Sequence, residues 1–558
     1  MNLDAFRQEL ATPRTSIQLC ILGLVGGLSA ASLIILFRLS VEWLQTLFLP
    51  QIDEFSALDP ILRLILPLFA VIVILAIAYV TGFKHYRMGI PFVIHRVKQY
   101  SGDIPVRTTI NQFLGGTLAL VGGFSVGREG PSVHLGAAGS SFLGIWLKLP
   151  YNSIRILAGC GIAAGISASF NTPFAAVIFV MEVVLREYKI HIFIPVMLAA
   201  ACGSVLTRMV FGEAQELSFI QFHDFDKWIY LYLILVGVIL GGLATLFNNA
   251  LMMVIRGFNR FNMVRRLLIA GCITGIVGFI LPEALGANFH SAHALFAQHN
   301  IQILLAVLCA KFFLTVIAIG LGVPGGVMGP VFVIGMLAGA LLVVPLDFVM
   351  NDADELTGSF ALLGMAGLMT AVVHAPLAAL SAVMELSYSP EIILPAILVI
   401  VPAYVTSTQL FGNRSVFIRQ LDFQKLPYTT SSVLEALQKT GVLAVMEKDF
   451  KLFKDKPDRH ILEFLETAPN HLAVRRSSFE IEVQYSFVEY DVSLGHDTSA
   501  LAFFNMQGVS SQATLAEVYE LLHTSRNGAV YVYSCEVTNI IGVVTWNTLR
   551  TNLHKERY

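Results

Sequence analysis

The residues best placed for chemistry are an arginine and a glutamate in the apolar segment VGGFSVGREGPSVHLG (121–136). Arg128 and Glu129 lie between Gly127 and Gly130, and a proline follows. Ionisable side chains at membrane depth are costly, so they are candidates for function. The glycines let the backbone open, and proline suits the first turn of a helix. We expect the amides of this helix start to bind a small anion, while Glu129 competes with that anion or carries a proton.

A second part of the chain repeats this pattern about 200 positions later. GREGP at 127–131 corresponds to GGVMGP at 325–330, and NTPFAAVIFVMEVV at 171–184 corresponds to HAPLAALSAVMELS at 374–387. The prolines of the first pair are 199 positions apart and the Val-Met-Glu blocks of the second pair 203. One large unit has therefore been duplicated. Apolar repeats broken by glycine and proline are typical of transporters and channels, whose interrupted helices end at a midplane binding site.

The composition indicates a membrane protein. The chain is 56% hydrophobic and 13% charged, with a mean hydropathy of +0.71, which is far from a soluble average. Uncharged runs such as 16–37, 64–83 and 229–255 are long enough to cross a bilayer. Shorter runs rich in glycine and proline are expected to form broken helices inside an all-α polytopic membrane domain. The net charge of −2 gives no indication of a nucleic-acid partner, and the cysteines show no metal-ligand spacing.

The character of the chain changes after about residue 424. Charges become frequent over 425–558, and no apolar run there reaches spanning length. An amphipathic helix is predicted around Leu515–Leu522, followed by β-rich runs at 529–533 and 540–546 and a short terminal helix. We expect a membrane domain over 1–424, with repeat halves at roughly 16–215 and 225–420, and a small α/β domain over 425–558.

In the type and order of these motifs, residues 16–420 resemble the CLC family of voltage-gated chloride channels and proton-coupled chloride transporters. GREGP (127–131) matches one motif of that family. GVPGGVMGP (322–330) is similar to a second, with methionine in place of its aromatic residue. Met88-Gly89-Ile90-Pro91 is similar to a third, G-S-G-I-P, and FNTPFAAVIFVMEV (170–183) resembles a helix that follows the first of these motifs.

The resemblance implies a homodimer in a lipid bilayer, with one pathway per subunit for chloride or another small anion. Its two repeat halves would have opposite membrane orientations, and Glu129 would be the gate. Helix N-termini from 88–91, 127–131 and 326–330 would converge on the anion. The anion-binding residues, acting mainly through their backbone, would be Met88, Gly89, Ile90, Gly127, Arg128, Glu129, Gly130, Val327, Met328 and Phe417.

Three positions depart from the family pattern. Chloride transporters of the family usually have a serine where this chain has Met88, and a tyrosine where it has Phe417 or, one register away, Val416. None of these side chains offers a hydroxyl donor. The inner glutamate of proton-coupled members corresponds to Val183, so protons would have to move through water. Its neighbour Glu182 is expected to cap or pair within the scaffold.

The tail resembles a CBS-domain pair, an appendage found in the same order in this family. A degenerate first repeat would cover about 440–478, and a second about 505–553. Such pairs often bind adenosine nucleotides through the acid of a G-h-h-T-x-x-D motif, but here Thr548 takes the place of the acid three positions after Thr545. A nucleotide site at these two threonines is one alternative, and a tail that only docks and braces a dimer is the other. No other cofactor and no metal is expected.

The leading hypothesis is chloride transport, as an anion channel or a weakly proton-coupled transporter, in a protein that is not an enzyme. The alternatives are a chloride/proton antiporter, a fluoride exporter and a membrane-anchored nucleotide sensor. A hydrolase would rest on GFSVG (123–127) alone, which follows no strand. The expected location is the inner (plasma) membrane of a bacterium. The N-terminus and the tail would then be cytoplasmic, because Arg7 and Arg14 precede the first helix.

Overall fold

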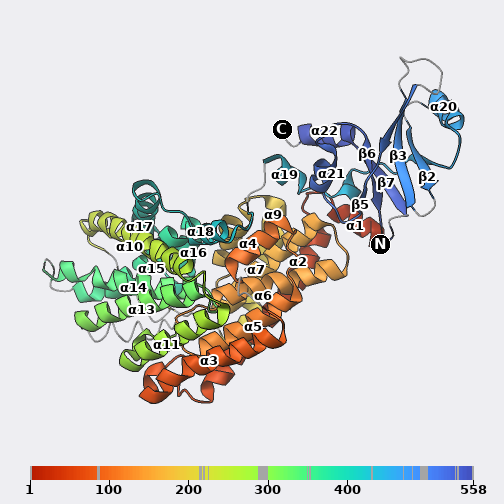
Figure 1. Cartoon of the computed structure of the whole chain (residues 1–558). Helices are drawn as coiled ribbons and strands as arrows, with labels where there is room; N and C mark the ends of the chain where they lie inside the picture. Colours follow the sequence, from red (N-terminus) through yellow and green to blue (C-terminus); the bar gives the residue numbers. More distant parts are fainter. Residues whose placement is uncertain are drawn as a thin grey trace. The chain divides into compact units, whose positions relative to one another are not determined.

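A computed structural model shows the chain as a helical part followed by a small α/β part (Figure 1), and this confirms the expected fold class. It divides into two compact units. The membrane unit comprises residues 20–143 and 156–428, and the tail unit residues 1–19, 144–155 and 429–558. The residues described are 3–83, 88–212, 217, 220, 222–223, 225–286, 300–348, 350, 353–428, 432–468, 471–479, 482–490, 500–534, 536 and 539–555.

The first half of the membrane unit is built from long helices, with shorter ones next to the glycine- and proline-containing motifs. Short 3-10 helix η1 (Phe55–Ala57) and π-helical turn η2 (Val180–Leu185) interrupt or extend them. In chain order the helices are α2 (Ile17–Thr46), α3 (Pro60–Val80), α4 (Ile90–Gln99), α5 (Val106–Val121), α6 (Glu129–Trp146), α7 (Tyr151–Phe170), α8 (Pro173–Phe179) and α9 (Ile190–Phe211).

The second half follows a similar plan. Its helices are α10 (Ile229–Gly257), α11 (Met263–Ile280), α13 (Ile301–Leu321), α14 (Met328–Leu341), α15 (Thr357–Val373), α16 (Pro376–Ser387), α17 (Ile393–Val405) and α18 (Val416–Gln424). The short connecting turns are η3 (Pro282–Ala284), η4 (Val344–Phe348), η5 (Ala353–Leu356), η6 (Pro390–Ile392) and η7 (Thr406–Leu410).

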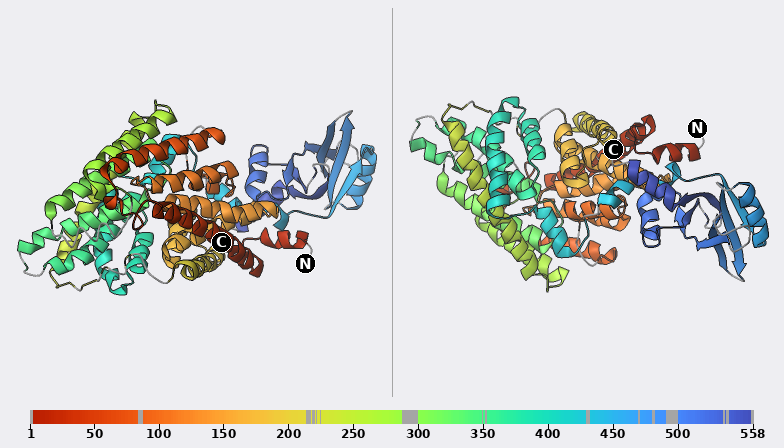
Figure 2. Two further views of the ribbon diagram at one scale, coloured as in Figure 1. Left: turned by 90° about the horizontal axis from the view of Figure 1, so that it is seen from below. Right: turned by 90° about the horizontal axis from the view of Figure 1, so that it is seen from above.

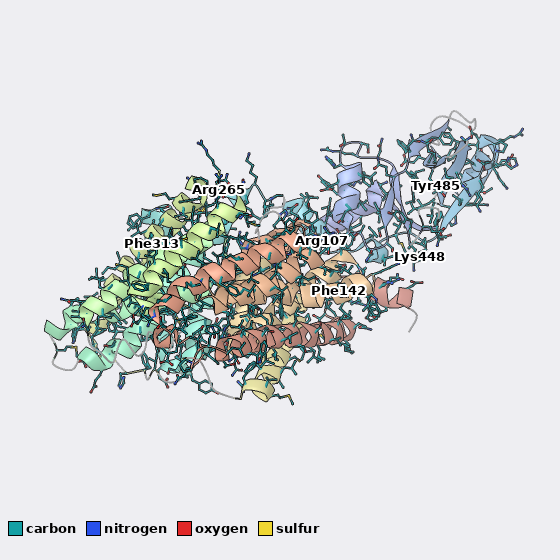
Figure 3. The ribbon with its side chains drawn as sticks, turned by 60° about the horizontal axis from the view of Figure 1, so that its bottom comes forward. Arg107, Phe142, Arg265, Phe313, Lys448 and Tyr485 are labelled. Carbon is teal, nitrogen blue, oxygen red and sulfur yellow. The ribbon has the colours of Figure 1, made fainter. Side chains whose placement is uncertain are left out.

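The outer surface of this unit is apolar. Among the described residues, nine helices are long and apolar enough to cross a membrane, judged by length and composition. Phe142 and Phe313, labelled in Figure 3, are 58% and 47% exposed. Large apolar side chains at this exposure suit contact with lipid. By contrast, Ser359–Val373 of α15 is buried along its whole length, as expected for a helix without a polar face.

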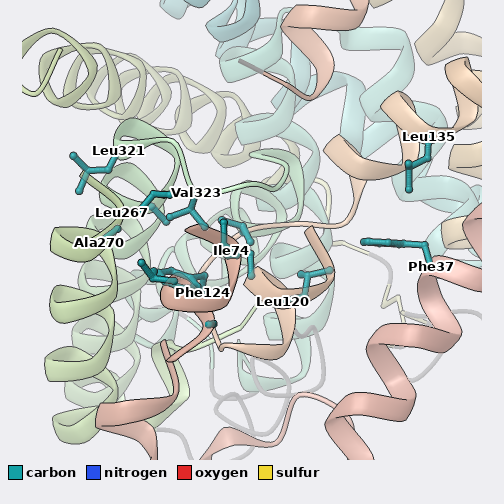
Figure 4. Close-up of a cluster of buried hydrophobic side chains, with 14 of the residues drawn as sticks. Phe37, Ile74, Leu120, Phe124, Leu135, Leu267, Ala270, Leu321 and Val323 are labelled. Atoms are coloured by element: carbon teal, nitrogen blue, oxygen red, sulfur yellow. The ribbon is translucent and has the colours of Figure 1, made fainter. Parts of the chain in front are cut away.

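A hydrophobic cluster joins the two halves (Figure 4). Phe37 of α2, Ile74 of α3 and Phe124, which follows α5, contribute from the first half. Leu267 of α11 and Leu321 of α13 contribute from the second. Since each of these side chains is nearly or fully buried, the two halves share one core and fold as a single unit.

Two glutamates exchange helix caps between the halves. The Glu182 carboxylate accepts hydrogen bonds from the amides of Leu377 (3.3 Å) and Ala378 (2.8 Å) at the start of α16. Glu385 does the same for Phe174 (3.0 Å) and Ala175 (2.7 Å) at the start of α8. Negative groups at helix N-termini are stabilising. Glu182 therefore caps a helix, as expected from the sequence, and Glu385, the equivalent residue of the second half, caps the equivalent helix of the first half.

The tail unit contains two small sheets with the same local plan. Strands β1 and β2 are parallel and joined through α20, and β3 pairs with β2 antiparallel; β5, α21, β6 and β7 repeat this arrangement. The repetition is compatible with a CBS pair. The elements are α1 (Leu3–Leu10), α19 (Ser432–Leu437), η8 (Val442–Ala444), β1 (Phe450–Lys454), α20 (Asp458–Thr467), β2 (Leu472–Phe479), β3 (Glu482–Tyr490), β4 (Leu501–Asn505), β5 (Gly508–Ser510), α21 (Leu515–Leu522), β6 (Ala529–Tyr533), β7 (Ile540–Thr545) and α22 (Trp546–Lys555).

Residues 1–19 and 144–155 belong to this unit, although the sequence-based boundaries assign them to the membrane domain. Both views of Figure 2 show α1 close to the tail. The carbonyl of Gln512 accepts a hydrogen bond from the Tyr151 amide at 2.8 Å, and the Gly441 amide donates to the carbonyl of Ala11 at 2.8 Å. These backbone bonds tie the tail to segments far from it in sequence.

Candidate anion pathway

Three helices of the membrane unit begin beside a glycine that is followed directly or one residue later by proline. α4 begins at Ile90 with Pro91 next, and its N-cap Gly89 has φ +81°, a conformation that strains other residues. In α6 and α14 the prolines, Pro131 and Pro330, fall at the third helical position. Proline is tolerated in a first turn because the amides there have no intrahelical partner, and the remaining free amides can bind an anion.

The starts of α6 and α14 are held side by side by a two-residue bridge. The Gly127 amide donates to the Gly326 carbonyl at 2.7 Å, and the Gly326 amide donates back at 2.7 Å. The two glycines are 199 positions apart, which is the offset of the repeat, so they are equivalent residues of the two halves. Gly130 must also be small, because a Cβ there would lie 2.8 Å from the carbonyl oxygen of Gly325.

The Glu129 side chain points into this junction. It is only 4% exposed, and its carboxylate accepts a backbone hydrogen bond from Gly329 in the first turn of α14. A Cβ on Gly326 or Gly329 would lie 2.8 or 2.7 Å from a carboxylate oxygen, and a Cβ on Gly127 would overlap one. One backbone amide of a helix start therefore holds the carboxylate, whose Oε2 atom has no hydrogen-bond partner among the described residues. Helix starts of this kind also suit small anions.

A cavity of about 650 Å³ opens on one side of the junction. The predicted residues Met88, Gly89, Ile90, Gly130 and Val327 all line it, so the structure brings the three motifs together.

Phe417, in the first turn of α18, also lines this larger cavity, whereas its neighbour Val416 is not among the described lining residues. Of the two positions considered, Phe417 is therefore the one that lines this cavity. The side chain of neither Phe417 nor Met88 can donate a hydrogen bond to an anion. The cations Arg260, Arg266 and Lys425 line the same cavity, and their charge favours the entry of anions.

A second cavity, of about 40 Å³, has Glu129 and Met328 in its lining. The rest of its lining is almost entirely apolar and includes Phe170, Phe179 and Phe332. Among its described lining residues, Glu129 alone has a titratable side chain. Its volume is enough for about one or two water molecules. Glu129 thus lines the small apolar cavity, while its neighbour Gly130 lines the larger one.

The remaining predicted residues lie elsewhere. Gly127 and Arg128 line neither cavity; the Arg128 guanidinium lies 4.6 Å from the centre of the Phe170 ring. Val183 is buried in η2, one turn after Phe179 of the smaller cavity.

In the tail unit, Thr545 and Thr548 are hydrogen-bonded to each other at 2.9 Å. The Thr548 hydroxyl also donates to the Glu447 carboxylate at 2.8 Å. Glu447 precedes β1 and was not identified from the sequence. It places a carboxylate beside Thr548, the position at which the sequence lacks the acid of the expected motif.

Two further residues of the membrane unit were missed or left without a role. Gln112 of α5 lines the larger cavity but belongs to no motif. Lys311 of α13 is buried, and its ammonium group donates to the carbonyls of Ala284, Leu285 and Gly286 at 3.2, 3.1 and 2.6 Å. Gln112 and Lys311 are 199 positions apart, so the repeat offset is the signal that could have drawn attention to Gln112.

Comparisons with known proteins agree with this architecture. A family model described as voltage gated chloride channel matches residues 74–408. The chain belongs to the voltage gated chloride channel (CLC) family. It is accordingly a multi-pass integral membrane protein, as the composition predicts.

Two relatives of this chain are named for chloride transport. The chain is 28% identical over 357 residues to a putative chloride channel protein ClcB-like from Ralstonia nicotianae, covering 62% of this chain and 83% of that one. It is 29% identical over 317 residues to the H(+)/Cl(-) exchange transporter ClcA of Salmonella agona, covering 55% and 67%.

Solved structures share the fold. A slow cyanobacterial Cl⁻/H⁺ antiporter has a TM-score of 0.62 at 22% identity, over 73% of this chain and 96% of that one. A CLC-type fluoride/proton antiporter has a TM-score of 0.60 at 25% identity, over 72% and 97%. A eukaryotic CLC transporter has a TM-score of 0.61 at 19% identity, over 95% and 97%, so the likeness of fold extends into the tail.

Proposed function

We propose that this protein transports chloride across a membrane through the larger cavity and past Glu129, which acts as the gate. The observation that carries the proposal is the position of the Glu129 carboxylate, bound by backbone groups at the start of α14. An ionised carboxylate and a chloride ion compete for such a place. Protonation removes the negative charge and frees the helix start for the anion.

The backbone of the three helix starts supplies most of the proposed anion contacts. Met88, Gly89, Ile90, Gly130 and Val327 act from the larger cavity, and Arg260, Arg266 and Lys425 attract anions to its opening. Contacts of this kind are weak and numerous, which lets an anion leave as well as enter. Gly127, Arg128, Met328 and Phe417 contribute by shaping the helix starts and the cavity wall rather than by donating from their side chains.

Chloride/proton exchange is the second candidate, because the ClcA relatives bear that name. In this chain the inner glutamate position is Val183, and the smaller cavity beside Glu129 is apolar. Protons would therefore reach Glu129 from one side through water at best. We propose weak coupling rather than obligatory exchange.

We further propose that the protein acts as a homodimer in the inner membrane of a bacterium, with the N-terminus and tail in the cytoplasm. The repeated strand–helix–strand–strand plan supports a CBS pair in the tail. Glu447, bonded to Thr548, supplies a carboxylate that could hold the ribose of an adenosine nucleotide. A tail that only braces the dimer is the alternative, and nucleotide binding to the full chain separates the two.

The function is tested by anion flux from proteoliposomes with simultaneous measurement of proton uptake. Chloride, nitrate and fluoride gradients are compared, so that a fluoride exporter would reveal itself by preferring fluoride. Glu129→Gln should conduct without responding to pH. Ser125→Ala is the matched control, since Ser125 is buried and bonded to Thr315 at 2.9 Å rather than facing the pathway. Absence of anion flux in the wild-type protein would refute the proposal.

A further inference from the structure

Gln112 is a buried carboxamide without a protein partner. It lies on α5, is 1% exposed and lines the larger cavity. Neither its Nε2 nor its Oε1 atom has a hydrogen-bond partner among the described residues. Buried polar atoms are almost always hydrogen-bonded, because leaving them unpaired is unfavourable. The missing partner must therefore come from whatever enters the cavity.

The neighbouring amide on the same helix behaves differently. Asn111 is also buried, but its Nδ2 donates to the Thr81 hydroxyl at 3.0 Å and to the Arg107 carbonyl at 2.8 Å. In the other half of the molecule, the residue equivalent to Gln112 is Lys311, whose ammonium group is satisfied by three carbonyls. Lys311 is thus hydrogen-bonded to the protein in the second half, whereas Gln112 has no such partner and lines a cavity in the first.

The face of α5 that carries Gln112 is the face next to the start of α6. Gly116 lies one turn further along α5, and a Cβ on it would lie 3.0 Å from Cγ of Pro131. Met88 and Phe417, which lack the donors usual in chloride transporters, line the same cavity as Gln112. A carboxamide carries two N–H donors and is uncharged, so it can bind an anion without trapping it.

We propose that the side-chain amide of Gln112 donates hydrogen bonds to the anion in the larger cavity, in place of the hydroxyl groups that Met88 and Phe417 do not supply. Nε2 faces the ion, and Oε1 accepts from the water that accompanies it. The inference rests on the proposed function, because it assigns a ligand within the same anion pathway. It makes Gln112 a residue that sets anion affinity.

The test is chloride binding to the purified full chain, measured by calorimetry. Gln112→Met keeps the length of the side chain and removes both donors, and chloride should bind about tenfold more weakly or worse, since hydrogen bonds to charged groups are strong. Asn111→Leu removes a buried amide of the same helix that does not line the cavity, and it should keep the wild-type affinity. Wild-type affinity in Gln112→Met would overturn the proposal.

Adding Met88→Ser to Gln112→Met should recover affinity by returning a donor to the same cavity. A double variant as weak as the single variant would show that lost packing, not lost donation, caused the change. If Gln112→Met does not fold, Gln112→Glu is made in the Glu129→Gln background, where residue 129 does not titrate. Chloride binding should then be weak at neutral pH and improve as the pH falls, and an affinity equal to that of Glu129→Gln at every pH would refute the inference. Wild-type protein that neither binds nor carries chloride would instead refute the proposed function.

Discussion

At the scale of single residues, the proposed pathway depends on the position of the Glu129 carboxylate. Glu129 is buried between the starts of α6 and α14, and the backbone around it is built from glycines that leave room for its oxygens. The same amides can bind the carboxylate or an anion, but not both. In the proposed function, protonation of Glu129 therefore makes the helix starts available to the anion.

Chloride flux is expected to rise as the external pH falls, because protonation removes the charge that competes with the anion. Glu129→Gln and Glu129→Ala should both give flux that does not change with pH. The measurement is chloride efflux from proteoliposomes over a series of external pH values. An alanine variant that retains the wild-type pH dependence would place the gate at another residue.

The central anion should be bound weakly, since Met88 and Phe417 offer no donors. Met88→Ser together with Phe417→Tyr should strengthen chloride binding by about 1–3 kcal/mol, because hydrogen bonds to charged groups contribute roughly that much each before reorganisation losses. Calorimetry on the purified double variant measures this. Since Phe417 lines the cavity and Val416 does not, unchanged affinity in a folded variant would mean that the ion passes elsewhere.

The motif residues could be predicted from the sequence, because glycine, proline and an ionisable group seldom occur together in an apolar run unless the helix is broken there. Gln112 could not be found in this way. A lone glutamine in a helix is ordinary, and apart from its repeat offset from Lys311 only its burial without a partner distinguishes it. The exchange of hydrogen bonds between Gly127 and Gly326 was equally out of reach, because pairing of residues far apart in sequence depends on the fold.

At the scale of elements, short helices are stabilised at their ends. α8 continues into η2 as one short helix, Pro173–Leu185, of a length that is marginal for an isolated helix, and its first amides are capped by Glu385 from α16. The first amides of α16 are capped in the same way by Glu182, which lies in η2 directly after α8. The two carboxylates join the halves of the membrane unit, and neither of them lines the two cavities described above.

Glu182→Ala and Glu385→Ala should each lower the stability of the folded protein by about 1–2 kcal/mol, which is typical for loss of a helix cap. The thermal unfolding midpoint of detergent-purified protein reports the change. Neither variant should alter the ratio of protons to chloride moved. A change in that ratio in Glu182→Ala, with stability intact, would place this carboxylate on a proton route instead.

The tail helix α21 begins with a capping box, in which the Thr514 side chain bonds to the Ala516 amide and the Glu517 carboxylate to the Thr514 amide at 2.9 Å. Burial raises the pKa of the Glu517 carboxyl above its ordinary value of 4.5. A raised folded-state pKa gives stability that is present below that ordinary value and is lost as the pH rises through the folded-state pKa. Hydrogen exchange of α21 in the full chain, corrected for intrinsic rates, should show easier opening at neutral than at acidic pH.

Glu517→Gln should remove this pH dependence, since its side chain does not titrate. Thr514→Ala should lower the opening free energy of α21 by about 1 kcal/mol. A Glu517→Gln variant with the same pH profile as the wild-type protein would assign the effect to another group.

At the scale of the whole molecule, a duplication has produced two halves that are alike in sequence and unequal in chemistry. Glu129 and Met328 are equivalent residues, as are Gln112 and Lys311, yet only one member of each pair is suited to meet an anion or a proton. The repeat offset could be predicted from the chain alone. The orientation of each half in the membrane could not, since an offset in sequence carries no information about direction in a membrane.

The last consequence concerns proton coupling. The smaller cavity reaches Glu129 through apolar side chains, and Val183, one turn after Phe179 in its lining, cannot hold a proton. A chloride gradient should therefore drive little proton movement in the wild-type protein, although chloride itself moves. Simultaneous recording of chloride efflux and proton uptake in liposomes measures the ratio, and Val183→Glu should raise it if the route ends there. Stoichiometric uphill proton pumping by the wild-type protein would make it an antiporter whose water-filled route opens only during transport.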